Sequence, residues 1–270
     1  MSRSPATHHI ELAGERTLLA RVWPGEGVPV VFLHGIFASS EVWTEVCAEL
    51  GRPCIAFDLP GFGGSDLPSA PDVSAYAEDI AAGVDALGLE RFELVGHSFG
   101  GAVAARLAEL LNSRVTSLVL FAPAGFGRIA LAEAMTVPGV RAVAEAIVRR
   151  SLARRHIALT ASAVTAARQA TVALVAAGRA LTTATFTAPV TAVWGTDDRV
   201  VRPKHSRDVT AAFPQADVVL FEGMGHHPAD ARPKEVLELL RTGRAARRVK
   251  RSRRRIFRPR PAVRLTPKFA

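Results

Sequence analysis

Cysteine is nearly absent from the 270 residues of this sequence, which contains only Cys47 and Cys54. Two cysteines are too few for a disulfide framework, so we interpret both as small buried apolar side chains. No run of about 18 apolar residues is free of charge, which argues against a membrane-spanning helix. The first nine residues also lack the apolar core of a signal peptide. These absences together predict a cytoplasmic protein.

Motifs for metal ions and nucleotides are missing as well. No Cys/His cluster has the spacing of metal ligands, and the glycines of 61–64 are not followed by the Lys-Ser/Thr pair of a phosphate-binding loop. We therefore expect no metal and no cofactor. Aromatic residues make up only 6% of the chain, from which we expect a mostly aliphatic substrate pocket.

Acidic residues are absent from two segments. The segment 243–270 contains 12 Lys or Arg residues, and without it the chain has 22 basic and 25 acidic residues. The net charge of +9 therefore comes entirely from this tail. Like charges repel and its three prolines interrupt helices, so we expect a disordered tail there. The second segment, 146–196, holds six arginines.

What the sequence does contain is a strand, a sharp turn and a helix in the order of a nucleophile elbow. An apolar strand near 92–97 runs into Gly-His-Ser-Phe-Gly at 96–100, and an Ala-rich helical segment follows. This turn lifts the serine hydroxyl clear of the sheet and points the positive end of the helix at it. Ser98 is therefore the candidate nucleophile, and the Phe99 N–H is a candidate oxyanion donor.

Apolar runs alternate with helical segments along most of the chain. A hairpin is expected at 8–23, and a helical insertion without strand-like runs is expected at 128–185. Buried strands are expected near 28–33, 54–58, 92–97, 115–121, 189–194 and 217–221. Helices are expected near 39–50, 72–87, 99–111, 203–213 and 233–240. The pattern predicts an α/β fold with a mostly parallel sheet, an N-terminal antiparallel hairpin and helices on both faces.

Several motifs in this order give the chain a close resemblance to the α/β-hydrolase family, in its serine-nucleophile branch. The resemblance covers about residues 10–240 and implies a core of 1–127 and 186–242, with 128–185 as a helical cap over the active site. The family places nucleophile, acid and base in the chain order Ser, Asp, His. The motifs are His34-Gly35 after a strand, DLPGFGGS at 58–65, the elbow, WGTDDRVV at 194–201 and GMGHHP at 223–228.

The resemblance also selects the partners of the serine. The family pattern Gly-x-Gly-His-x-Pro selects His226 rather than His227 as the base that takes the serine proton. The pattern Trp-Gly-x-x-Asp selects Asp198 rather than Asp197 as the acid that orients the imidazole. The expected triad is thus Ser98, Asp198 and His226.

The remaining candidate site residues lie in the loops around this triad. The loop after His34 is expected to supply a second oxyanion donor, the Ile36 N–H, and the family uses the histidine to brace that loop. Asp58 is interpreted as a loop anchor rather than a catalytic acid. The candidate substrate-pocket residues are Phe37, His97 and His227. Each also has a structural interpretation, which is core packing for Phe37 and His97 and a loop position for His227.

A serine nucleophile excludes the aspartate-nucleophile branches of the family, the haloalkane dehalogenases and epoxide hydrolases. The expected activity is hydrolysis of a small carboxylic ester or related acyl substrate. An alternative is carbon–carbon bond hydrolysis in a vinylogous diketone acid, whose charge would suit the arginines of 128–185. An alternative of another class is a non-catalytic binding module attached to polyanions or anionic membranes by 243–270. We expect no specific nucleic-acid site, and the sequence does not define the oligomeric state.

Deletion of 243–270 should leave hydrolytic activity nearly unchanged, because every expected catalytic residue precedes this tail. The deletion should abolish salt-sensitive retention on heparin or anionic vesicles, since each basic residue that neutralises a phosphate or sulfate releases counterions. Chromatography over a salt gradient measures this. A truncated protein that unfolds or loses activity would contradict the prediction.

Overall fold

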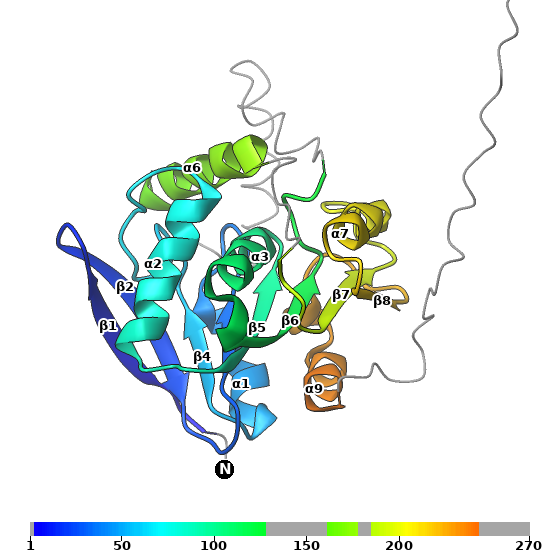
Figure 1. Ribbon diagram of the computed structural model, residues 1–270, viewed down its shortest axis with the longest axis horizontal. Helices are drawn as coiled ribbons and strands as arrows, with labels where there is room; N and C mark the ends of the chain where they lie inside the picture. Colours follow the sequence, from blue (N-terminus) through cyan, green and yellow to red (C-terminus); the bar gives the residue numbers. More distant parts are fainter. Residues whose placement is uncertain (1–2, 128–160, 178–184, 243–270) are drawn as a thin grey trace, which may run out of the picture.

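The computed structural model describes residues 3–127, 161–177 and 185–242. Within these residues, eight strands form one sheet in the order β1-β2-β4-β3-β5-β6-β7-β8 (Figure 1). The hairpin of β1 (Ala6–Leu12) and β2 (Arg16–Trp23) is antiparallel, and β2 also pairs antiparallel with β4. The other pairs are parallel and join β3 (Val30–Leu33), β4 (Cys54–Phe57), β5 (Phe92–His97), β6 (Val115–Phe121), β7 (Val190–Gly195) and β8 (Asp217–Phe221). The predicted sheet is confirmed.

Helices pack on both faces of the sheet, as predicted. One apolar cluster includes side chains of α2 (Val73–Ala86), α3 (Phe99–Leu111) and α7 (Ser206–Ala212). The other cluster includes side chains of α1 (Thr44–Leu50), α8 (Pro228–Ala231) and α9 (Pro233–Thr242). Each face of the sheet is thereby covered, which leaves the carboxyl ends of the parallel strands to carry functional loops.

Alternate residues of the central strands supply the two cores. Val31 and Leu33 of β3 belong to the cluster that includes α2 and α3, whereas Val30 and Phe32 belong to the opposite cluster. All four side chains are fully buried. A continuous apolar run is therefore what this strand requires, because successive side chains point to opposite faces.

The helix expected from residues 39–40 onward has its N-cap at Ser39, as predicted, but its first turn is not α-helical. Its first turn is a 3₁₀ helix, η1 (Ser40–Trp43), and α1 follows directly. The Ser39 hydroxyl accepts a hydrogen bond from the Glu41 N–H at 3.4 Å, which satisfies one free donor at this end. The helix ends at Gly51, whose φ of 86° suits glycine best.

The part of 128–185 that the structure describes as a helix is α6 (Ala161–Ala177), which packs on α2 and α3 (Figure 1). The side chains of α6 that are fully buried include those of Ala166 and Ala170, whose small size lets α6 lie close to its neighbours. A Cβ atom at Gly61 would lie 2.8 Å from the Ala166 Cβ, so α6 also touches the loop after β4. The residues 128–160 and 178–184 lie outside the described residues, as does the tail 243–270. The helical cap and the disordered tail remain predictions.

Both cysteines are free and buried, as expected. Burial raises the pKa of the Cys47 thiol. In the described ranges, no helix combines the length and apolarity that a membrane crossing requires.

Candidate active site

Ser98 lies in the sharp turn between β5 and α3, with φ 54° and ψ −117°. Two glycines make the turn possible. A Cβ atom at Gly96 would lie 2.5 Å from the Gly100 carbonyl oxygen, and one at Gly100 would lie 2.6 Å from the Leu33 carbonyl oxygen. Any side chain at either position would therefore push β5, α3 and β3 apart.

The backbone of the turn is also fixed to the last residue of β6 and to the loop that follows it. The Ser98 N–H donates to the Phe121 carbonyl oxygen at 2.9 Å, and the Ala124 N–H donates to the Ser98 carbonyl oxygen at 2.9 Å. Both bonds leave the serine side chain unconstrained while they hold its main chain. The Ser98 hydroxyl therefore projects from a main chain that is fixed in position.

The structure brings together the three residues of the expected triad. The His226 Nε2 lies 3.0 Å from the Ser98 Oγ, and its Nδ1 lies 2.7 Å from the Asp198 Oδ2. An ionised carboxylate only accepts hydrogen bonds, so Nδ1 carries the proton and Nε2 is free to accept the serine hydroxyl. This tautomer is the one that a general base requires.

Asp198 is held from its other side by the chain that follows it. Its side chain is fully buried, and its Oδ1 accepts the N–H groups of Val200 at 2.8 Å and Val201 at 3.0 Å. Asp197, by contrast, is exposed and accepts a hydrogen bond from the Thr196 hydroxyl at 3.3 Å. The structure therefore places Asp198, and not its neighbour, against the imidazole.

His34 links two loops and has neither ring nitrogen free. Its Nε2 accepts the Leu59 N–H at 2.9 Å, and its Nδ1 donates to the Gly35 carbonyl oxygen at 2.7 Å. Burial lowers the pKa of His34, which keeps the ring neutral. This arrangement suits the bracing role that the family resemblance implies, and it leaves no nitrogen for catalysis.

The loop after β3 runs beside the nucleophile. A Cβ atom at Gly35 would lie 3.1 Å from the Ser98 Cβ. Ile36 and Phe37 follow, both half-buried, and Phe37 has a φ of 62°, which is unusual for a residue other than glycine. Phe99 is fully buried as the first residue of α3. The N–H groups of Ile36 and Phe99 remain predicted oxyanion donors.

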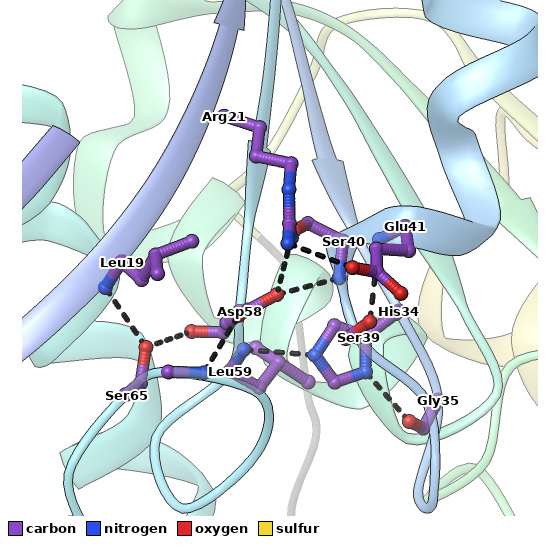
Figure 2. A network of polar contacts seen from close by, with 11 residues as sticks. Leu19, Arg21, His34, Gly35, Ser39, Ser40, Glu41, Asp58, Leu59 and Ser65 are labelled. Carbon is purple, nitrogen blue, oxygen red and sulfur yellow. Dashed lines mark hydrogen bonds and ion pairs between the residues drawn. The ribbon is translucent and has the colours of Figure 1, made fainter. Parts of the chain in front are cut away.

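Asp58 is the centre of a polar network that supports this loop (Figure 2). Its carboxylate is almost fully buried and accepts the Ser40 N–H at 2.6 Å and the Gly64 N–H at 2.8 Å. The Arg21 guanidinium lies 3.5 Å from the same carboxylate and also hydrogen-bonds the Ser40 hydroxyl. Asp58 thus joins the loops after β3 and β4, as an anchor would. Arg21 was not expected, because only its position opposite Ala56 in the sheet brings it there.

Two of the expected pocket residues form a cluster with His226. The ring centroids of His226 and His227 are 5.2 Å apart, and those of His97 and His227 are 5.6 Å apart. The His97 ring is buried, and its Nε2 lies 2.7 Å from the His226 carbonyl oxygen. His97 therefore contacts the loop of the candidate base, an arrangement that its position in the elbow did not reveal.

The sequence resembles known proteins over most of its length. The family model described as the alpha/beta hydrolase fold matches residues 28–174, more than half of the chain. The chain belongs to the α/β-hydrolase family. An uncharacterised protein of Mycobacterium tuberculosis is 30% identical to this α/β hydrolase over 257 residues, which cover 80% of the chain and 75% of the relative.

Two solved esterases resemble this α/β hydrolase over almost their whole length. A thermophilic esterase from Thermogutta terrifontis is 25% identical, with a TM-score of 0.70, over 87% of this chain and 97% of the esterase. The esterase RhEst1 from a Rhodococcus species is 26% identical, with a TM-score of 0.65, over 89% of this chain and 98% of the esterase. The chain thus has a hydrolase fold with esterases among its structural neighbours.

Replacement of Asp58 by Asn should lower the free energy of unfolding by about 2 kcal/mol. The amide retains one acceptor oxygen, but its NH₂ group would face one of the two N–H donors that the carboxylate now accepts. Urea unfolding measures the change.

Asp66→Asn is the matched control, because the exposed Asp66 carboxylate accepts the Thr17 N–H at 2.8 Å, which the amide oxygen can still accept. The control should change stability by less than about 0.5 kcal/mol. Equal losses in the two variants would contradict the anchoring role of Asp58.

Proposed function

We propose that this chain is a serine hydrolase that cleaves small carboxylic esters through an acyl-enzyme. One observation carries the proposal, which is the continuous hydrogen-bonded path from the Ser98 hydroxyl through His226 to the buried Asp198. A serine hydroxyl is a weak nucleophile at neutral pH and needs such a base.

In the first half of the reaction, the Ser98 Oγ attacks the ester carbonyl carbon while the His226 Nε2 takes its proton. The imidazolium then protonates the leaving alkoxide as the carbon–oxygen bond breaks, and the alcohol departs. Asp198 stabilises the positive charge on the ring during both events. The product of this half is an acyl ester on Ser98.

In the second half, His226 takes a proton from water, whose oxygen attacks the acyl carbon. The bond to the Ser98 Oγ breaks, the serine recovers its proton from the imidazolium, and the carboxylic acid leaves. Negative charge develops on the carbonyl oxygen in each half. The N–H groups of Ile36 and Phe99 are proposed to donate to it, and one such donor typically accounts for a factor of about 100 to 1,000 in rate.

Ester hydrolysis is preferred to the two alternatives. The two esterases support it by sequence and structure together. Carbon–carbon bond hydrolysis would draw support from the arginines of 128–185, and the one among them that lies within the described residues, Arg168, is exposed. A purely binding role would give no reason for a base and a buried acid to converge on a strained serine.

Ser98→Ala should abolish turnover of p-nitrophenyl esters and labelling by a fluorophosphonate probe while the unfolding midpoint stays unchanged, because the hydroxyl adds reactivity rather than core volume. His226→Ala should reduce both readouts to background. His227→Ala serves as the neighbouring control and should retain turnover. If His227 proves indispensable and His226 does not, the proposed base is wrong.

Asp198→Asn should lower kcat by about 10⁴, because the amide favours the wrong imidazole tautomer. The exposed neighbour provides the control, since Asp197→Asn removes one charge without touching the imidazole and should cost far less. Steady-state kinetics on one ester measures both variants. Comparable losses would show that the acid is misassigned.

A further inference from the structure

The loop that carries His226 contains two glycines, one on each side of the buried Met224. Gly223 has a φ of 67°, and a Cβ atom at Gly225 would meet nothing within 4 Å. Glycines give this segment more backbone freedom than other residues would. A catalytic imidazole needs a fixed position, since a displacement of about 1 Å can cost a factor of about 100 in rate. Contacts from outside the loop must therefore supply the restraint.

The first half of the loop is restrained by the segment after β7. The Gly223 N–H donates to the Thr196 hydroxyl at 2.9 Å, and the Asp197 N–H donates to the Met224 carbonyl oxygen at 3.0 Å. Both bonds lie before Gly225. On the other side, the Ala231 N–H donates to the His227 carbonyl oxygen at 3.1 Å, and the Asp198 carboxylate lies 2.7 Å from the His226 Nδ1. The His226 carbonyl oxygen is left to be held by another contact.

His97 makes that contact. Its Nε2 lies 2.7 Å from the His226 carbonyl oxygen, and a carbonyl oxygen only accepts, so Nε2 carries the hydrogen. His97 is the last residue of β5 and directly precedes Ser98. The bond therefore fixes the backbone of the base relative to the nucleophile, although the two residues are far apart in the sequence.

The rings reinforce this bond. The His97 and His226 ring centroids are 4.9 Å apart at an interplanar angle of 49°, and His97 is only 6% exposed. Burial lowers the pKa of His97 well below its usual value, and the neighbouring rings of His226, His227 and His34 act in the same direction. A neutral ring still has one N–H, which is the one this bond uses.

We propose that His97 is a positioning residue that holds the carbonyl of His226, and thereby the imidazole, at its distance from the Ser98 hydroxyl. This inference rests on the proposed function, in which His226 is the base. It differs from both roles considered from the sequence, core packing and substrate contact, because His97 acts through a hydrogen bond to His226.

Two variants separate the hydrogen bond from packing. In His97→Gln, the side-chain amide places an N–H near the position of Nε2, whereas His97→Met fills a similar volume without a strong donor. We expect H97M to lower kcat by about 10- to 100-fold, with KM within about twofold, and H97Q to recover most of the loss. His205→Met is the control for loss of a buried histidine, since His205 pairs with Asp208 and not with the triad. It should leave kcat unchanged.

Equal kcat values for H97M and H97Q would overturn the proposal, because the ring would then matter only as packing. A change confined to KM would also overturn it and make His97 a substrate contact. So would a loss in H205M as large as that in H97M.

A measurement without substrate tests His97 independently of the proposed reaction. The proton on the His226 Nδ1, bonded to Asp198, should give a low-field proton NMR resonance in the full chain. H97M should shift or broaden this resonance, and H97Q should preserve it. An unchanged resonance in H97M would overturn the positioning role. Absence of esterase activity in the unaltered chain would count against the proposed function alone, since this resonance still reports on His97.

Discussion

The positive φ angle of Ser98 is the constraint on which the candidate site depends. A residue other than glycine in such a conformation costs about 1–3 kcal/mol, so the surrounding structure must hold it there. The close approach of β5 to α3 at Gly96, and of α3 to the end of β3 at Gly100, does this. Phe37 and Ala122, which follow the neighbouring strands β3 and β6, also have positive φ angles. Three strained residues therefore lie together at the carboxyl ends of neighbouring strands, where reacting groups must be fixed.

The elbow was predictable because its determinants are local. The strand, the two glycines and the start of α3 lie within a short stretch, and each restricts the same turn. The acid and the base were harder to assign, since Asp198 and His226 each have a neighbour of the same residue type. The family pattern was needed for that choice. The structure supplies the physical distinction for the acid, since Asp198 is buried beneath two N–H donors and its neighbour Asp197 is exposed.

Contacts between distant segments could not be predicted from local patterns. Arg21 reaches Asp58 only because β2 pairs with β4 in a register that sets Arg21 opposite Ala56. The bond from His97 to His226 likewise depends on how the loop after β8 folds back over β5. A smaller omission, the short helix α8, had a local signal, since Pro228 stands at its first turn.

The histidines of the site have two different roles, support of the backbone and proton transfer. His34 and His97 are buried, have lowered pKa values and each donate one N–H to a backbone carbonyl, whereas His226 is hydrogen-bonded to a carboxylate. A second charged ring at 4.9 Å from a His226 imidazolium would add about 3 kcal/mol of repulsion at an effective dielectric constant of about 20. Because the His97 ring is neutral, this repulsion with the His226 imidazolium does not arise. Since the bond from His97 uses the N–H of the neutral ring, the imidazolium can form and discharge on His226 while its backbone stays held.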